Sequence, residues 1–426
     1  MPNANVAEPD PSWADKLGPG LIAGAADDDP SGIATYSQAG AQFGFGMLWT
    51  LVLTYPLMVG IQIISARIGR VTGHGLATNI RRHFPAWLLY VIVSLLLMAN
   101  TINIAADVAA MGDALTLVAG GPAHWYAVGF GLVSVLLQVF IPYSRYVSIL
   151  KWLTLALLAY VATVFVVHIP WRSVALEGIS LPRLPWSAAF ITTIVAIFGT
   201  TISPYLFFWQ ASQEVEELRA DDEAHALKKV PGKARPDFMR IKLDTYIGMG
   251  FSNLVALFIM LTTAVTLHLH GIDDIDSSAK AAAALKPVAG NFAFFLFALG
   301  IIGTGLLAVP VLAGSAAYAV AGAFRWKSSL EHEPSVASKF YGIIVLATLA
   351  GVGLVFAPID PMRALYWSAV INGVISIPVM AIMMLLACRS AVMGRLVIGK
   401  RLKVLGWLCT GVMTLAVVAM LVLQLS

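Results

Sequence analysis

The sequence predicts an all-α polytopic membrane protein with eleven spanning helices. Two five-helix halves are expected to form inverted repeats, in which the first and sixth helices are broken. Of the 426 residues, 59% are apolar and only 12% are charged, whereas a soluble domain carries roughly 25% charged residues. Lipid must therefore cover much of the surface. Two long apolar segments are interrupted by polar runs that contain proline, and these runs predict the breaks.

The spans follow from the length of the apolar segments, because a helix needs about 20 mostly apolar residues to cross a bilayer. A polar tail at 1–16 comes first and lacks the pattern of a signal peptide. We assign 17–168 to the first repeat, 187–387 to the second and 403–424 to the eleventh helix. The expected spans cover about 18–42, 47–67, 87–118, 125–141, 148–168, 187–213, 243–267, 290–321, 339–357, 363–387 and 403–424.

The basic residues predict the orientation of the chain. If the N-terminus is cytoplasmic, 22 of the 27 Lys and Arg residues lie on inner segments. The positive-inside rule therefore predicts an inner N-terminus and an outer C-terminus. The expected location is a prokaryotic plasma membrane. This distribution also accounts for the net charge of +4 without a nucleic-acid partner. The longest polar stretch, Glu214 to Arg240, is interpreted as a solvated, partly helical cytoplasmic loop, and Ile272 to Leu285 as an outer surface segment with a short helix.

The first break is expected in span one, where three consecutive acids, Asp27 to Asp29, precede Pro30 and Gly32. Charge inside a span is costly, so an intramembrane acid indicates function by default. Proline lacks a backbone N–H and disfavours a helical predecessor, so the helix should open into two halves here. Freed carbonyls together with carboxylates form an oxygen-rich cation site. The structural alternative is a plain proline kink with aspartates that reach toward the interface.

The second break is expected in span six, in the run Ile197-Phe198-Gly199-Thr200-Thr201-Ile202-Ser203-Pro204. It lies five spans after the first. Interrupted helices at matching positions of two halves are typical of inverted-repeat transporters, whose site lies between the breaks near the midplane. Span one enters from inside and span six from outside, as inverted topology requires.

Further polar residues occur inside the spans. Asn100, Asn103 and Asp107 share one face of span three, where they either line the cavity or form interhelical hydrogen bonds. Asn372 lies six residues before Pro378 and either reaches the site or caps a kink.

At these breaks the chain resembles the Nramp family of divalent-metal transporters. The family's Asp-Pro-Gly-Asn break and its Gln-Ala-Gly-Ala segment correspond to Asp29-Pro30-Ser31-Gly32 and Gln38-Ala39-Gly40-Ala41. The family's Gly-Ala-Thr-Val-Met-Pro-His corresponds to Gly199-Thr200-Thr201-Ile202-Ser203-Pro204-Tyr205. The resemblance implies a leucine-transporter-type fold and divalent-cation uptake by alternating access.

The departures from the family pattern concern the metal ligands. Ser203 stands where the family has a metal-binding Met, and Gly32 stands where it has an Asn. A thioether favours softer metals, whereas hydroxyl, carbonyl, carboxylate and water suit Mg²⁺, which also keeps several waters. The chain therefore resembles the Nramp-related magnesium transporter branch, which implies uptake of Mg²⁺ and also of Mn²⁺. The implied metal-site residues are Asp28, Asp29, Ser31, Gly32, Thr200 and Ser203, and those of the surroundings or pathway are Asp27, Asn103, Asp107, Tyr205, Gln210 and Asn372.

Proton coupling is the second departure. Asp107 matches an acid of the family's third helix, but Ala110 replaces its Glu and Tyr205 replaces the sixth-helix His. We therefore expect uncoupled transport, for which a divalent ion gains about 4.6 kcal/mol from a potential of 100 mV.

Three other functions were weighed. One is a proton-coupled Mn²⁺/Fe²⁺ transporter of the Nramp type, and another is a Na⁺-coupled symporter of an organic solute with the same fold. Three aspartates at the break would repel the carboxylate of such a solute. The third is an intramembrane aspartyl hydrolase that uses Asp29 or Asp28 with Asp107, although no second motif supports an enzyme. The sequence indicates no cofactor; the expected partners are the divalent metal ion and the lipid bilayer, and the sequence identifies no particular protein partner.

Overall fold

The computed structural model describes residues 23–24, 26–141, 153–179, 187–220, 224–330 and 333–425. All regular elements in these ranges are helices, so the predicted fold class is confirmed; the polar tail at 1–16 lies outside them. The helices are α2 (Pro30–Phe43), α3 (Leu48–Thr72), α4 (Leu76–His83), α5 (Ala86–Ala119), α6 (Ala123–Phe140), α8 (Leu158–Val166), α9 (Trp171–Ile179), α10 (Ala188–Thr201), α11 (Pro204–Ala220), α12 (Ala234–Thr266), α13 (Ser278–Ala283), α14 (Lys286–Ala289), α15 (Ala293–Phe324), α16 (Ser338–Leu354), α17 (Pro361–Ala387), α18 (Ser390–Met393) and α19 (Lys400–Leu425).

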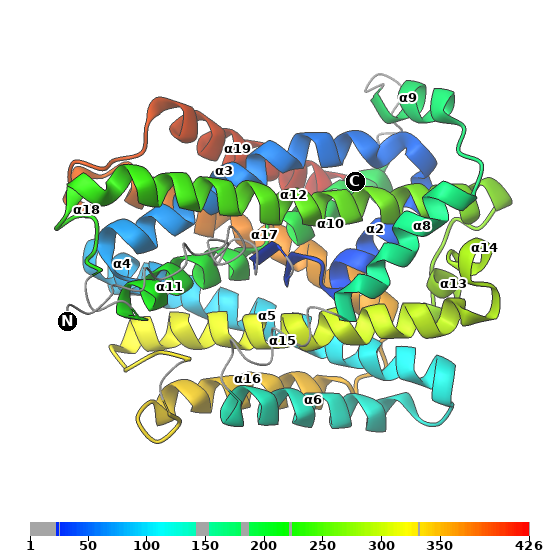
Figure 1. Ribbon diagram of the computed structural model, residues 1–426, viewed down its shortest axis with the longest axis horizontal. Coiled ribbons are helices and arrows are strands. Elements are labelled where there is room, and N and C mark those ends of the chain that lie inside the picture. Colours follow the sequence, from blue (N-terminus) through cyan, green and yellow to red (C-terminus); the bar gives the residue numbers. More distant parts are fainter. Residues whose placement is uncertain are drawn as a thin grey trace, which may run out of the picture.

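The long helices run roughly along one axis of the molecule (Figure 1). Helices α6 and α16 pack together along one edge, and α3 and α19 lie near the opposite edge (Figure 1). The short helices α4 and α18 lie at one end of the bundle, whereas α9, α13 and α14 lie at the other (Figure 1). In the predicted orientation, the α4/α18 end faces the cytoplasm and the α13/α14 end faces outward.

Long apolar helices lie at the expected spans except 148–168, whose first residues lie outside the described ranges, and 339–357, where the helix Ser338–Leu354 is shorter. Among the described residues, eight helical stretches are long and apolar enough to cross a membrane, and a pair bent by 112°, Leu155–Val166 with Trp171–Gly178, would make a ninth. The first stretch, Pro30–Thr72, covers two expected spans because a short 3-10 helix, Gly44–Met47, joins α2 directly to α3. The count of eleven stays a prediction. The surroundings differ between stretches: the pair α10–α11 is buried within the protein, whereas α6 and α19 are largely exposed along the edges.

The expected cytoplasmic loop is shorter and less solvated than predicted. Helix α11 continues to Ala220 and α12 begins at Ala234. The Glu214 side chain is fully buried, because Arg240 of α12 lies 2.5 Å from its carboxylate. Glu214, Glu217 and Arg240 therefore hold α11 and α12 together, and the acidic run 221–223 lies outside the described residues. The expected short helix of the outer segment is present as α13, whereas α4 and α9 were not predicted.

Two backbone contacts fix the helices around the breaks. A β-carbon at Gly199 of α10 would lie 1.9 Å from the Ala369 carbonyl of α17 and 2.6 Å from the Gly373 nitrogen. A β-carbon at Gly24 would lie 2.3 Å from the Gly248 carbonyl of α12. Small residues permit this close approach of membrane helices. The segment before the first break thus lies against α12, and the segment before the second break lies against α17.

Candidate functional site

The first helix breaks where the sequence predicts. Ala23, Gly24, Ala26 and Asp27 are helical, Asp28 and Asp29 are not, and α2 begins at Pro30. Asp29 is the N-cap: its Oδ1 accepts hydrogen bonds from the Gly32 nitrogen at 2.8 Å and from Ser31 Oγ at 2.6 Å. An aspartate satisfies the free N–H groups of a helix start in this way. The cap holds one carboxylate oxygen and leaves the other to face α5 and α11.

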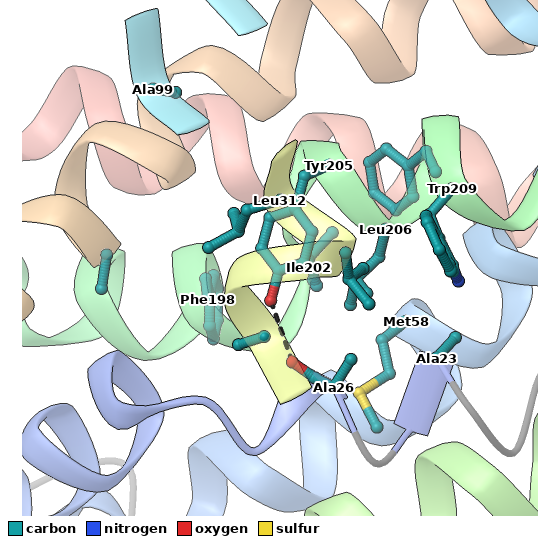
Figure 2. Packing of buried hydrophobic residues seen from close by; sticks show 14 of the residues in the cluster. Ala23, Ala26, Met58, Ala99, Phe198, Ile202, Tyr205, Leu206, Trp209 and Leu312 are labelled. Carbon is teal, nitrogen blue, oxygen red and sulfur yellow. Dashed lines mark hydrogen bonds between the residues drawn. The ribbon is translucent and has the colours of Figure 1, made fainter. Parts of the chain in front are cut away.

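The second oxygen of Asp29 connects three helices. Asn103 of α5 donates to Oδ2 at 3.1 Å, and the Tyr205 hydroxyl of α11 lies 3.4 Å from it. The same hydroxyl donates to the Ala26 carbonyl at 3.2 Å (Figure 2). The predicted meeting of the two breaks is therefore organised around the Asp29 carboxylate, and Asn103 and Tyr205 contact it directly.

The neighbouring aspartates turn toward a different helix. The Ser252 hydroxyl of α12 lies 2.6 Å from Asp27 Oδ2 and 3.1 Å from Asp28 Oδ1. The other oxygen of each carboxylate is buried and has no hydrogen-bond partner in the described part of the chain. The three consecutive aspartates thus separate into Asp29 facing α5 and α11, and a buried pair facing α12. Their spacing in the sequence gave no indication of Ser252.

The second break lies between the end of α10 at Thr201 and the start of α11 at Pro204. The buried Ser203 hydroxyl lies 2.8 Å from the carbonyls of Gly199 and Thr200, to which its single proton can be donated. Thr200 also faces the first break, because a β-carbon at Gly32 would lie 3.3 Å from Thr200 Oγ1. Gly32, Thr200 and Asp29 therefore lie together, and the two breaks pack closely at this glycine.

The face of α5 that the sequence singled out divides between two roles. Asn100 donates to the Leu312 carbonyl at 2.8 Å and to Ser315 Oγ at 2.7 Å, both on α15. Asn103 contacts Asp29, and the buried Asp107 is near enough to Asp29 for their charges to interact. On this face of α5, Asn100 therefore forms hydrogen bonds to α15, whereas Asn103 and Asp107 lie near the first break.

Two further predicted residues are buried amides without a partner among the described residues. Both side-chain polar atoms of Asn372 in α17 and of Gln210 in α11 lack a hydrogen bond within these ranges. Asn372 precedes Gly373, which lies against Gly199 of α10. Its amide therefore does not cap the kink at Pro378, and it lies beside the helix that leads into the second break.

The donor set around Asp29 consists of oxygen atoms and amides. Within the ranges that the structure describes, no three His, Cys, Asp or Glu side chains converge as a metal site. Asp29 supplies a carboxylate and Thr200 a hydroxyl beside the first break, whereas the Ser203 hydroxyl contacts the carbonyls of Gly199 and Thr200 in its own segment. Such donors can hold a hard cation that retains part of its water.

A cavity that sequence reasoning missed opens toward the α13/α14 end. It has a volume of about 410 Å³ and reaches from Ala34, one turn beyond Pro30, to Thr192 of α10 and Tyr366 of α17. Gln38 lies on its wall, and its Oε1 accepts a hydrogen bond from the Ile275 nitrogen at 2.9 Å. The Gln38-Ala39-Gly40-Ala41 motif, which contains a cavity-lining residue, could have indicated this part of the cavity wall.

Acidic residues of the outer loop lie beside this cavity. Asp274 lines it, although Arg363 does so too. Asp276 follows in the loop, and its hydrogen bond with Lys280, at 2.7 Å, lowers the pKa of the Asp276 carboxyl. The mixed charges give the cavity entrance no single-sign field.

Ion pairs close the opposite side of the site, toward the α4/α18 end. Arg240 of α12 lies 2.5 Å from Glu214 and 3.0 Å from Glu217, both on α11. Arg70 of α3 lies 2.7 Å from Asp237 of α12. The Arg240 pairs tie α11 to α12, and the Arg70 pair ties α3 to α12. The cavity of about 410 Å³ thus lies toward the α13/α14 end, and these ion pairs lie toward the α4/α18 end.

Comparisons with known proteins agree with this architecture. A manganese transporter from Eremococcus coleocola, solved with an aromatic bis-isothiourea compound, superimposes with a TM-score of 0.71 at 19% identity over 97% of this chain and 88% of that chain. A variant of the same transporter gives a TM-score of 0.74 with the same identity and coverage. Mhp1, a nucleobase-cation-symport-1 family transporter, shares the fold with a TM-score of 0.55 at 14% identity over 96% and 92% of the two chains.

These structures establish the fold, and the sequence establishes the family. The family model described as natural resistance-associated macrophage protein-like matches residues 20–423, which include both breaks and every candidate site residue. The chain therefore belongs to the Nramp family.

Proposed function

We propose that this protein carries Mg²⁺, and also Mn²⁺, across the membrane by alternating access and without proton coupling. Membership in a family of divalent-metal transporters supports the ion class. The manganese transporter that shares its fold supports Mn²⁺ as one cargo. The metal is the substrate, and the proposal needs no resident cofactor.

The observation that carries the Mg²⁺ assignment is the lack of a soft donor at the two breaks. Ser203 presents a hydroxyl in place of a thioether, and its proton is directed to backbone carbonyls. Gly32 contributes no side-chain ligand and packs closely against Thr200. An oxygen-lined site suits an ion that keeps several waters, whereas sulfur would favour softer ions.

The uncoupled mechanism rests on the groups beside Asp29. Tyr205 and Asn103 contact this carboxylate, and neither titrates near neutral pH. Ala110 stands one turn from Asp107, where the family has a glutamate. A proton relay leading away from Asp29 therefore lacks two titratable residues. In this mechanism the membrane potential drives cation entry.

Alternating access is supported by the asymmetry of the two sides. The cavity beside Ala34 gives an ion a route toward Asp29 from the α13/α14 end. The ion pairs of Arg240 and Arg70 hold the other side closed. Release to that side requires α11 to move relative to α12, which separates Arg240 from Glu214.

Ion flux into proteoliposomes that contain Mg²⁺-sensitive and pH-sensitive dyes tests the proposal. We expect Mg²⁺ entry that responds to an imposed potential, is abolished by Asp29→Ala and leaves the internal pH unchanged. A Mg²⁺-dependent acidification would contradict the uncoupled mechanism. Absence of any divalent-metal entry would contradict the transport function itself.

A further inference from the structure

The Ala26 carbonyl is deprived of its normal helical partner by the sequence itself. In an α-helix the carbonyl of residue i accepts from the N–H of residue i+4. For Ala26 that residue is Pro30, which has no N–H. A buried carbonyl without a partner is costly. It is also a suitable ligand for a cation that stands beside Asp29.

The Tyr205 hydroxyl occupies this carbonyl. It donates to the Ala26 oxygen at 3.2 Å and lies 3.4 Å from Asp29 Oδ2. The side chain is fully buried in the hydrophobic cluster of Figure 2, to which Phe198 and Leu312 also belong. The Tyr205 hydroxyl therefore stands between the Ala26 carbonyl near the end of the inner half-helix and Asp29 Oδ2, which also accepts from Asn103, at the start of the outer half.

We propose that Tyr205 is a specificity-determining residue that preserves the hydration of the bound cation. Its hydroxyl holds the Ala26 carbonyl, so that a cation at Asp29 cannot take this oxygen as a direct ligand and retains a water in its place. When the cation engages Asp29 Oδ2, the hydroxyl proton remains with Ala26 and its oxygen can accept from a metal-bound water. This inference rests on the proposed transport of Mg²⁺ and Mn²⁺.

The selectivity follows from the cost of losing water. Mg²⁺ dehydrates reluctantly and usually keeps several waters. Mn²⁺ also accepts carboxylate and carbonyl ligands but exchanges its water more readily. A site that withholds one carbonyl therefore sacrifices little affinity for Mg²⁺ and more for Mn²⁺. Tyr205 thus reduces the advantage that Mn²⁺ would have at a site with more direct ligands.

Tyr205→Phe removes the hydroxyl and retains the ring. We expect the preference for Mn²⁺ over Mg²⁺, measured as the ratio of dissociation constants on purified protein and as the competition constants in uptake, to rise about tenfold, which corresponds to about 1.4 kcal/mol. Pulsed electron paramagnetic resonance of bound Mn²⁺ in deuterated water should show one coordinated water fewer than in the wild type. Neither readout would move if the hydroxyl were only a structural link.

Tyr160→Phe is the matched control, since it removes a buried hydroxyl from α8, away from the breaks. It should retain the wild-type ratio and water count. An unchanged ratio and water count in Tyr205→Phe would overturn the inference, even if wild-type transport is intact. If that variant does not fold, Tyr205→Leu, which also lacks the hydroxyl, faces the same two outcomes. Failure of the wild type to bind or carry either ion would instead reject the proposed function.

Discussion

The loss of the Asp29 charge is the perturbation that the structure describes most completely. In Asp29→Asn the remaining side-chain oxygen can still accept from Ser31 and from the Gly32 nitrogen, so the N-cap is preserved. The Asn103 oxygen has no partner in the described ranges, so rotation of this amide lets it accept from the new amide. We therefore expect a folded protein whose melting temperature stays close to that of the wild type.

The effect on the ion is expected to be much larger. Two unit charges 4 Å apart interact by about 4 kcal/mol at an effective dielectric constant of about 20, so a divalent ion loses about 8 kcal/mol of attraction. If desolvation of the buried carboxylate offsets three quarters of this gain, about 2 kcal/mol remains, which lowers affinity about 30-fold. Initial Mn²⁺ uptake at a subsaturating concentration should fall by at least this factor.

The control for this experiment is a second aspartate in the same local motif. Asp360 caps α17, accepts from the Met362 and Arg363 nitrogens at 2.9 and 3.1 Å, and precedes Pro361. Asp360→Asn should retain wild-type uptake. Uptake by folded Asp29→Asn within threefold of the wild type would refute the assignment of Asp29 as the principal cation ligand.

Three other substitutions probe separate parts of the account. Ser203→Met supplies a soft ligand and should increase Cd²⁺ inhibition of Mn²⁺ uptake about tenfold; unchanged inhibition would reject the donor argument. Gly199→Ala forces α10 away from α17 and should destabilise the protein by about 1–3 kcal/mol in thermal unfolding. The control is Gly129→Ala on α6, where an added β-carbon meets no atom within 4 Å, and it should not destabilise the protein. Arg240→Gln leaves the buried Glu214 without its cation and should cost about 2–3 kcal/mol, less than the about 3–5 kcal/mol for a fully buried pair; a melting temperature equal to that of the wild type would contradict the closing role of this ion pair.

The breaks were predictable because their cause is local. Pro30 and Pro204 lack an N–H, and each follows a polar run within an apolar segment, so the sequence alone contains the reason for each interruption. The extent of α11 was not predictable in the same way. In the sequence, the charged end of α11 resembles a solvated loop. In the structure, Glu214 of this end pairs with Arg240 of α12, which is distant in the sequence. A run of charged residues therefore predicts exposure to solvent unless an oppositely charged residue, distant in the sequence, pairs with it.

The sequence predicted which residues lie near the first break better than it predicted how they are arranged. Periodicity on α5 placed Asn103 and Asp107 on one face; Asn103 contacts Asp29, and Asp107 is near enough for its charge to interact with that of Asp29. The non-helical backbone at Asp28 and Asp29 removes that periodicity, so the sequence could not show that Asp27 and Asp28 turn toward Ser252. For the same reason it gave no sign that the Tyr205 hydroxyl takes the Ala26 carbonyl.

The central claim is that an oxygen-lined site at two helix breaks accepts Mg²⁺ as well as Mn²⁺. Mn²⁺ uptake into proteoliposomes, measured with increasing external Mg²⁺, tests it most directly. We expect millimolar Mg²⁺ to suppress Mn²⁺ entry by direct competition at the Asp29 site. Mn²⁺ entry that is undiminished by millimolar Mg²⁺ would contradict it.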